Sequence, residues 1–462
     1  MRDYTKVLVG SGVDPAIFRA YDVRGVYPSQ VNGEVAYVLG LAFGSMVGDG
    51  KVLIGRDVRL SGPELVRYLA LGLEDSGLQV YDSGVVPTPA LYLGVVEGGF
   101  DGGVQVTASH NPPEWNGFKF VTGTGETISQ GMGMEELRER AFSLRGRKAP
   151  EREANVKRFD VTGRYIERLK GLVRPRRRLR VAVDFSNGAG SVIGKKLLQE
   201  IGVDLVPLND VPDGRFPAHL PEPTPETTEE LRRVVRETGL DLGAALDGDA
   251  DRAVFSDDRG RLMEGDLSLA VLVSALDVRG KVVYDVSCSS VVEEVIRSKG
   301  CEPVLCRVGR AFMLRKVREV KAVIGAEKSN HLYFSEIHGF DDGIFAVAKM
   351  VEAVSKMDLP LSEFIDSLPK RYSSTIFSVN LPNDELKWRA MDSIARMLSA
   401  MAKETLTIDG VKAYLDDGWV LIRPSNTMPQ IKYTAESSSE EGLRRLLSLA
   451  EQVIAESVKE LG

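Results

Sequence analysis

Cysteine is scarce in this chain of 462 residues, and its scarcity narrows the kinds of site that the protein can carry. Only Cys288, Cys301 and Cys306 occur, too few for a disulfide framework and without the spacing of a metal site. A disulfide-stapled scaffold and a cysteine-based metal centre are therefore excluded. We expect the reducing setting of the cytoplasm.

Long apolar runs and an excess of positive charge are also missing. No apolar stretch approaches the roughly 20 residues of a membrane-spanning helix, and residues 1–5 lack the basic and apolar regions of a signal peptide. The net charge of −7 gives no general attraction for nucleic acid. We interpret the basic stretch at 174–180 as a solvated lead-in to the next strand. Neither a membrane nor a nucleic acid is expected as a partner.

What the chain does contain is ample core material, with 43% hydrophobic and 27% charged residues, and its length favours about three or four domains. One pattern occurs three times: a β-branched strand, a turn with Asp or Ser, a helix, a second strand, and later a third strand that ends in a polar loop. The predicted strands are 52–57, 78–81 and 103–106, then 181–184, 203–206 and 242–246, then 281–285, 303–305 and 322–324. Strands that alternate with helices predict α/β domains.

The third strands of the three copies end in three different polar loops, at 107–112, 247–252 and 327–331. Ligand sites in open α/β sheets lie beyond the carboxyl ends of the strands. We therefore expect three related α/β domains, with mixed or parallel sheets, around a central cleft.

From about residue 373 the pattern changes to that of a smaller α+β domain. Strands are expected near 375–379, 412–415, 419–423 and 430–434, and helices at 388–401 and 440–461. The predicted domains are 1–158, 159–262, 263–372 and 373–462.

The loop at 247–252 is the most informative segment. Asp247, Asp249 and Asp251 alternate with small residues, and Arg252 closes the loop. Three carboxylates at this spacing can surround one hard divalent cation, which prefers oxygen ligands. With a coordination position left for a phosphate, such a cation serves phosphoryl transfer. The alternative is an acidic surface turn, because Asp and Gly are common in turns.

Ser109 occupies the loop after the third strand of the first copy, between Ala108 and His110. A serine hydroxyl attacks only when a base or an activated electrophile helps it, and a turn or cap serine is the alternative. Lys119 is a candidate phosphate partner or proton donor, or else an ordinary surface lysine. Arg24 is a further charged candidate for the site, and its alternative role is that of a partner in a structural ion pair.

Two further loops carry polar side chains that suit a phosphorylated sugar. Glu327, Ser329 and His331 alternate, so an extended backbone would place them on one face, against sugar hydroxyls; a solvent-facing turn is the alternative. The stretch 423–427 combines an arginine fork with hydroxyl and amide donors, which suit a phosphate dianion, and a plain turn is the alternative there. For the turn at 187–190 we expect tight strand-to-helix packing.

Together, and in this order along the whole chain, these segments resemble the α-D-phosphohexomutases. The loop at 107–112 resembles the phosphoserine loop of that family, and 247–252 its magnesium loop. The loop at 327–331 resembles its sugar-recognition loop, and 423–427 its phosphate-binding loop. The resemblance implies three related α/β domains and a C-terminal domain built around a small sheet.

The resemblance also implies roles for individual residues. Ser109 would carry a phosphoryl group, and one Mg²⁺ per chain would be held by the Ser109 phosphate and the three aspartates. Arg24, Lys119 and His331 would transfer protons or stabilise charge, and Arg252 would orient the phosphoserine or balance the carboxylates. The implied substrate-binding residues are Arg252, Arg310, Glu327, Ser329, Arg423, Ser425, Asn426 and Thr427.

The implied reaction interconverts hexose 1-phosphate and hexose 6-phosphate through a 1,6-bisphosphate, with glucose or mannose 1,6-bisphosphate as activator. Asn426 in the phosphate-binding loop, together with the Glu327–Ser329–His331 form of the sugar-recognition loop, resembles the phosphomannomutase/phosphoglucomutase group. Met428 replaces a glutamate of many phosphoglucosamine mutases, and Asn330 and Arg310 depart from the residues frequent at their positions. A phosphoglucosamine mutase and a non-catalytic sugar-phosphate-binding protein remain alternatives. The sequence does not indicate the oligomeric state.

Overall fold

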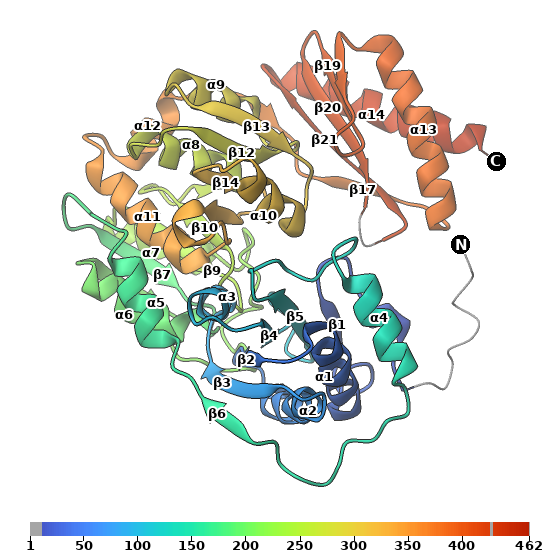
Figure 1. Cartoon of the computed structure of the whole chain (residues 1–462). Coiled ribbons are helices and arrows are strands. Elements are labelled where there is room, and N and C mark those ends of the chain that lie inside the picture. The colour runs from blue at the N-terminus through green and yellow to red at the C-terminus, as the bar shows by residue number, and fades with distance from the viewer. Residues whose placement is uncertain (1–11, 426–427, 462) are drawn as a thin grey trace. The chain divides into compact units, whose positions relative to one another are not determined.

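The computed structural model describes residues 12–425 and 428–461. Its helices and strands are labelled in Figure 1, and its internal contacts divide the chain into two units. Unit one consists of Met1–Glu264 and Asn330–Ser362, and unit two of Gly265–Ser329 and Glu363–Gly462. Each unit contains two sheets.

The first sheet of unit one has six strands in the order β1-β5-β4-β2-β3-β6. These strands are β1 (Val23–Val26), β2 (Lys51–Arg56), β3 (Gln79–Val85), β4 (Gly102–Val106), β5 (Trp115–Thr122) and β6 (Val156–Arg158). Strand β5 runs antiparallel to its neighbours β1 and β4, whereas β4, β2, β3 and β6 are parallel. The accompanying helices are η2 (Pro15–Ile17), α1 (Gly33–Val47), α2 (Gly62–Asp75), α3 (Thr88–Glu97) and α4 (Met134–Ser143).

The strands of this sheet that end at the polar loops are buried between the helices. Strand β4 is buried along its whole length, and β2 along all but its end residues. Apolar residues of α1, α2, β2 and β4 form one core cluster, to which Phe118 and Phe120 of β5 contribute. The start of α1 is fixed by Asn32, whose side chain accepts a 3.1 Å hydrogen bond from the Val35 amide. Burial along the strands leaves the loops at their ends as the place for most polar side chains, with Gln105 and Lys119 as buried exceptions.

The second sheet has five strands in the order β11-β10-β9-β7-β8. They are β7 (Arg180–Asp184), β8 (Asp204–Leu208), β9 (Leu242–Leu246), β10 (Ala253–Ser256) and β11 (Leu262–Met263), with helices α5 (Thr162–Lys170), α6 (Gly190–Glu200) and α7 (Glu229–Thr238). Strands β7, β8 and β9 are parallel, and β10 pairs antiparallel with β9. The loop 247–252 is therefore the connection of a hairpin between β9 and β10.

The segment Asn330–Ser362 groups with unit one although it follows Ser329 of unit two. It contains β15 (Leu332–Phe334), η3 (Ser335–Ile337), α11 (Gly343–Lys356) and the start of α12 (Leu361–Ser367). Helix α11 packs against β9, β10 and α6. Asp342 caps it by accepting from the Phe345 amide, and also accepts from the Tyr165 hydroxyl.

Unit two contains three parallel strands in the order β13-β12-β14. Its first part is formed by α8 (Gly265–Ala275), β12 (Lys281–Asp285), α9 (Ser290–Ser298), β13 (Glu302–Cys306), α10 (Arg310–Glu319) and β14 (Ile324–Ala326). The strand predicted at 322–324 thus lies two residues further on. Lys321 precedes it in the left-handed region, at φ 54°, so the turn after α10 extends to that point.

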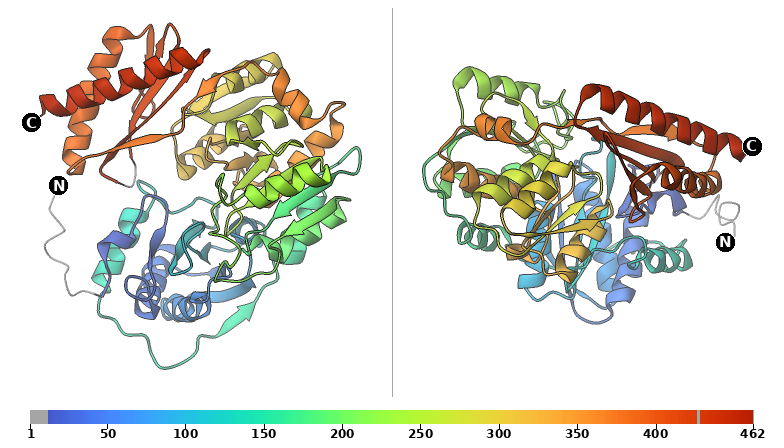
Figure 2. Two further views of the ribbon diagram at one scale, coloured as in Figure 1. Left: turned by 180° about the vertical axis from the view of Figure 1, so that it is seen from behind. Right: turned by 90° about the horizontal axis from the view of Figure 1, so that it is seen from above.

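The C-terminal part of unit two is an antiparallel sheet with two long helices. Its strands are β16 (Tyr372–Ser373), β17 (Phe377–Asn380), β18 (Glu404–Leu406), β19 (Val411–Leu415), β20 (Gly418–Pro424) and β21 (Gln430–Ser437). Helix α13 (Asp384–Met401) and helix α14 (Glu440–Glu460) pack on each other and on these strands. Figure 2 shows α14, in red, lying along the sheet.

The predicted fold class is confirmed: three α/β domains are followed by a C-terminal domain with an antiparallel sheet. The four predicted boundaries and the central cleft stay predictions. Within the described residues, no helix combines the length and apolar character that crossing a membrane requires.

Candidate active site

The serine loop follows the buried strand β4 and holds Ser109 in a left-handed conformation, at φ 49°. Ser109 is 3% exposed. Its amide donates a 2.9 Å hydrogen bond to the Thr107 hydroxyl, which in turn donates to Oδ2 of Asp57 at 2.7 Å. The side chain of Ser109 is therefore presented from a fixed backbone.

Arg59 holds the same loop through hydrogen bonds to its backbone. Its guanidinium donates to the backbone carbonyls of Ser109, Asn111, Pro112 and Trp115 at 2.6–2.8 Å, and its Nε donates to Asp57 at 3.0 Å. Arg59 is 1% exposed, and burial lowers its pKa while the Asp57 carboxylate opposes the shift. The buried guanidinium of Arg59 thus supplies hydrogen bonds to four carbonyls that would otherwise lack donors.

The acidic loop between β9 and β10 is buried as well. Asp247 and Asp249 are fully buried, and Asp251 is 1% exposed. The loop is held by its backbone, because the Gly248 amide donates to the Pro221 carbonyl and the Gly248 carbonyl accepts from the Ala189 amide. This burial contradicts the alternative of an acidic surface turn.

The turn at 187–190, for which tight strand-to-helix packing was expected, packs directly on this loop. A Cβ on Gly188 would lie 2.7 Å from the Gly248 carbonyl oxygen, and one on Gly190 would lie 2.7 Å from Leu246. Close approach of the two backbones explains why glycine occurs at both positions.

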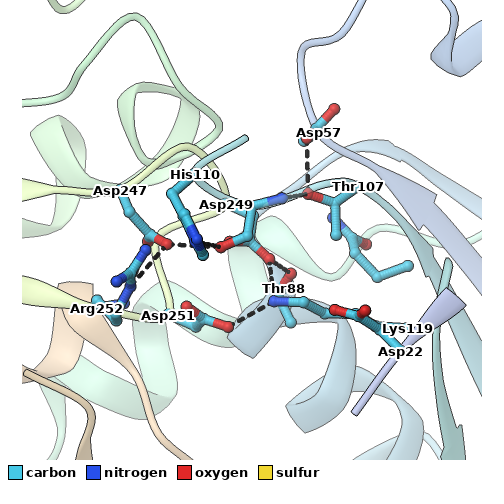
Figure 3. A network of polar contacts seen from close by, with 12 residues as sticks. Asp22, Asp57, Thr88, Thr107, His110, Lys119, Asp247, Asp249, Asp251 and Arg252 are labelled. Atoms are coloured by element: carbon cyan, nitrogen blue, oxygen red, sulfur yellow. Dashed lines mark hydrogen bonds and ion pairs between the residues drawn. The ribbon is translucent and has the colours of Figure 1, made fainter. Parts of the chain in front are cut away.

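The serine loop and the acidic loop meet within unit one (Figure 3). The Ser109 hydroxyl donates to Oδ2 of Asp247 at 2.8 Å. Lys119, which projects from β5 and is 4% exposed, donates to Asp249 at 2.7 Å and to Asp251 at 2.6 Å. Lys119 is thus not a surface lysine, and the residues predicted for phosphoryl transfer lie in one buried cluster.

The cluster concentrates negative charge where water cannot screen it. Burial, followed by the neighbouring charge of Asp251, raises the pKa of Asp247 to about 7. Burial works against the charge on Arg252 too, but the Asp247 and Asp251 carboxylates outweigh it and raise the pKa of Arg252. Arg252 donates to Asp247 through Nε at 3.2 Å and therefore balances part of this charge.

The three aspartates are suited to hold a divalent cation. Each offers one carboxylate oxygen, and these oxygens lie within 4.8 Å of one another. Oδ1 of Asp249 is buried and accepts no hydrogen bond from any described residue. Mg²⁺ prefers oxygen ligands, and these carboxylates supply oxygens that carry negative charge, including the buried Oδ1 of Asp249.

Two further residues border the serine. Arg24 of β1 donates to Asp22 at 2.5 Å and to the side chain of Asn111. His110, which the sequence interpretation left out of the site, has Nδ1 3.3 Å from the Ser109 hydroxyl. Burial and the positive charges of Arg252 and Arg24 lower the pKa of His110, so its ring is neutral.

His331 lies in unit one, beside the acidic loop. Its Nε2 is 3.7 Å from Oδ1 of Asp251 and 4.0 Å from Oδ2 of Asp341. Sequence reasoning placed His331 in the site but gave no hint of Asp341. The pairing brings a titratable ring next to one of the candidate metal ligands.

Glu327 and Ser329 belong to unit two, and one expectation for their loop is wrong. The backbone from 327 to 331 is not extended, since residues 328–330 form a turn with Asn330 at φ 70°. Asn and Gly tolerate this left-handed conformation, whereas most residues do not. Glu327 is 2% exposed and accepts a 2.7 Å hydrogen bond from the Gly309 amide, next to Arg310 at the start of α10.

The candidate phosphate-binding loop lies at the end of β20. Arg423 is 7% exposed, with Nη1 3.9 Å from Oδ2 of Asp409. Ser425 is 2% exposed, and its carbonyl accepts from Lys387 at 3.0 Å. The predicted partners Asn426 and Thr427 lie outside the described residues.

The residues that sequence reasoning missed act through other residues. Asp57 and Arg59 hold the serine loop, and Thr88 contacts Asp249. Asp57 is the last residue of the predicted strand 52–57, and a polar residue at a strand end is a signal for a functional position, but nothing local distinguishes Arg59 or Thr88 from ordinary turn and helix-start residues.

Comparison with known proteins assigns the whole chain to one family. The description "Phosphoglucomutase/phosphomannomutase" matches in four consecutive parts: alpha/beta/alpha domain I at residues 15–146, domain II at 163–260, domain III at 264–372 and the C-terminal domain at 379–452.

Individual relatives agree with this assignment. A phosphomannomutase/phosphoglucomutase of Pseudomonas putida is 33% identical over 447 residues, which cover 95% of each chain. A Methanopyrus kandleri protein named "Probable phosphoglucosamine mutase" is 36% identical over 458 residues, 96% of this chain and 99% of the relative. The crystal structure of a phosphoglucomutase/phosphomannomutase family protein of Burkholderia thailandensis matches with a TM-score of 0.87 at 32% identity, covering 96% of this chain and 98% of the other. The chain therefore belongs to the phosphoglucomutase/phosphomannomutase family of α-D-phosphohexomutases and is an enzyme of the phosphohexomutase type.

Proposed function

We propose that this enzyme interconverts the 1-phosphate and 6-phosphate of mannose, of glucose or of both, through a phosphoserine at Ser109 and a sugar 1,6-bisphosphate. The observation that carries the proposal is the 2.8 Å hydrogen bond from the buried Ser109 hydroxyl to Asp247 of the acidic loop. It joins the candidate phosphoryl carrier to the candidate metal ligands, which phosphoryl transfer requires in one place.

Asp247, Asp249 and Asp251, with an oxygen of the Ser109 phosphate, would hold the Mg²⁺. The donor set supports this assignment because all its atoms are oxygens within 4.8 Å of one another. When bound, the cation would supply positive charge that offsets the negative charge of the phosphoryl group during transfer.

The reaction needs two transfers at Ser109. In the first, the Oγ–P bond of phosphoserine breaks as a sugar hydroxyl forms a new O–P bond and loses its proton, giving the bisphosphate. In the second, the other phosphoryl group returns to Oγ, and the sugar oxygen that it leaves takes up a proton. A 1,6-bisphosphate of glucose or mannose is the activator, because it can phosphorylate Ser109 directly.

Lys119, Arg24 and His331 are the groups proposed to move protons or stabilise charge. Lys119 already donates to two carboxylates of the acidic loop, and His331 lies 3.7 Å from Asp251. His110 is a neutral ring beside the nucleophile, with Nδ1 3.3 Å from the hydroxyl oxygen.

The residues of unit two are proposed to bind the rest of the substrate. Arg423 and Ser425, with Asn426 and Thr427, would grip the phosphate that is not reacting. Glu327, Ser329 and Arg310 would contact the sugar hydroxyls, and the hydrogen bond from the Gly309 amide fixes the carboxylate of Glu327 for that contact.

A phosphoglucosamine mutase is the second candidate, favoured by the 36% identity to the Methanopyrus kandleri relative. Against it stands Met428, which cannot pair with an amino group through a charge. A sugar-phosphate-binding protein without turnover is disfavoured because binding alone gives no reason for a buried serine aimed at a carboxylate.

A coupled assay on mannose 1-phosphate, glucose 1-phosphate and glucosamine 1-phosphate, with Mg²⁺ and glucose 1,6-bisphosphate present, separates the three. We expect the kcat/KM for mannose 1-phosphate or glucose 1-phosphate to exceed that for glucosamine 1-phosphate. A preference for glucosamine 1-phosphate would assign the second candidate, and no turnover of any substrate would overturn the mutase proposal.

A further inference from the structure

Thr88, the first residue of helix α3, makes a two-point contact with the acidic loop. Its amide donates to the Asp249 carbonyl at 3.0 Å, and its hydroxyl donates to the carboxylate oxygen Oδ2 of the same residue. Thr88 is fully buried. Figure 3 shows its side chain pointing at Asp249.

The contact makes the two carboxylate oxygens of Asp249 unequal. Oδ2 accepts from both Thr88 and Lys119, the latter at 2.7 Å. Oδ1 is buried and accepts from no described residue. A carboxylate pinned by one oxygen presents the other in a fixed direction, which is how residues outside the metal's own ligand set orient the ligands.

We infer that Thr88 is a positioning residue, which sets the rotamer of Asp249 so that Oδ1 faces the cation. The inference rests on the proposed metal site at Asp247, Asp249 and Asp251. It gives a residue that follows β3 of the first sheet an indirect part in metal binding, through Asp249 of the loop that follows β9.

Helix α3 strengthens this assignment. The helix has ten residues, and its first amide donates to the backbone carbonyl of Asp249. The positive end of the helix dipole therefore lies against the backbone of the loop that carries the three carboxylates. The helix dipole does not distinguish the two carboxylate oxygens of Asp249, whereas the Thr88 hydroxyl bonds only to Oδ2.

The test compares Mg²⁺ and Mn²⁺ affinity, measured by isothermal titration calorimetry on the unphosphorylated enzyme, in wild type, Thr88→Val and Thr88→Ser. Valine keeps the shape of threonine and removes the donor, so Thr88→Val should bind either ion roughly 10-fold to 100-fold more weakly. Serine keeps the donor and should restore the wild-type affinity within a factor of about three. Thr88→Ala repeats the test if the valine variant does not fold.

Thr162→Val is the matched control, because Thr162 is likewise the first residue of a helix, α5, and within the described residues its amide donates to Asp160 and not to the acidic loop. It should bind both ions like the wild type. Thermal unfolding in chelator shows whether each variant is folded before the ions are added.

The outcomes are distinguishable. Wild type that binds neither ion, both unphosphorylated and after phosphorylation by glucose 1,6-bisphosphate, overturns the proposed metal site and this inference with it. Wild-type affinity in the folded Thr88→Val or Thr88→Ala variant overturns the inference alone. Weak binding in Thr88→Ser as well would also overturn it, because the hydroxyl would then not be the cause.

Discussion

The hydroxyl of Ser109 donates a hydrogen bond to Asp247, a residue 138 positions later in the chain. Each residue lies in the loop that follows a strand, and the two strands, β4 and β9, belong to different sheets. Each loop is held by contacts of its own: Arg59 donates to the serine loop, and the backbones of Pro221 and Ala189 bond to the acidic loop. The candidate nucleophile and the candidate metal ligands are therefore positioned before a substrate arrives. Preorganisation of this kind lowers the cost of reaching the transition state.

Replacing Ser109 with alanine should abolish phosphorylation of the enzyme. Incubation with glucose 1,6-bisphosphate is expected to add the mass of one phosphoryl group to the wild type and none to Ser109→Ala, as read by intact-mass spectrometry. Ser29→Ala, at an exposed serine, should be phosphorylated like the wild type. A phosphoryl group retained by Ser109→Ala would place the nucleophile elsewhere.

Mg²⁺ should stabilise the folded enzyme through the three aspartates. An ion that binds only the folded state adds about 2.7 kcal/mol to the free energy of unfolding at a concentration 100 times its Kd. We expect Mg²⁺ to raise the Tm of the wild type, and Asp249→Asn to lose most of this rise because it removes an anionic ligand. Asp204→Asn, at an exposed aspartate of β8, should keep the rise. An equal rise in Asp249→Asn would exclude Asp249 as a ligand.

Local pattern predicted the three strands of each α/β copy and the loops at their ends, because an apolar strand with a polar end is a property of a short segment. It did not predict the antiparallel strands β1, β5 and β10. Strands β9 and β12 have the predicted bounds. The three-residue strand β18 was missed, since so short a segment carries little pattern. The sequence left a turn at 327–331 as the alternative to an extended backbone, because alternate polar residues occur in turns as well as in strands.

Contacts between distant segments were not visible in the sequence. Lys119 reaches Asp251 across 132 positions, and Thr88 reaches Asp249 across 161. The partners follow from how the sheets of unit one pack, which no spacing along the chain reveals. All three cysteines are buried free thiols, as a reducing setting allows. The cytoplasmic setting itself stays a prediction.

Arg59 should be worth far more to stability than a surface arginine. Lysine at this position keeps the charge but cannot serve four carbonyls and Asp57 at once, so Arg59→Lys should lower the free energy of unfolding by about 3 kcal/mol. Arg67→Lys is the control, since Arg67 is 39% exposed and pairs only at the surface, and it should change stability by less than about 0.5 kcal/mol. Urea unfolding measures both. Equal effects would show that the carbonyl contacts add nothing.

His219 should make stability depend on pH. Its Nδ1 faces the Leu220 carbonyl at 2.8 Å and its Nε2 faces Asp184 at 3.0 Å, so only the doubly protonated ring donates to both. Burial opposes the charge, but these two bonds and the charges of Asp184 and Glu230 outweigh it and raise the pKa of His219.

A raised folded-state pKa means that the stabilisation is complete below the ordinary value of about 6.5 and is lost as the pH rises through the folded-state pKa. The wild type should exceed His219→Gln in free energy of unfolding by about 1 kcal/mol at pH 6, and the difference should shrink toward pH 9. Urea unfolding across this range checks it. A difference that grows with pH would mean that the ring is neutral in the folded state.

Gly248 allows the serine loop and the acidic loop to approach each other. A Cβ at Gly248 would lie 2.5 Å from the Ser109 carbonyl oxygen, closer than such atoms come, so Gly248→Ala must push the loops apart. Misplacement of a reacting group by about 1 Å costs roughly 100-fold in rate, so kcat should fall by about that factor while KM changes little. At Gly163 the nearest atom to a Cβ is Asp160 Oδ2 at 3.5 Å, an ordinary contact, and Gly163→Ala should keep the wild-type kcat. Wild-type kcat in Gly248→Ala would show that transfer does not depend on the contact between Ser109 and Asp247.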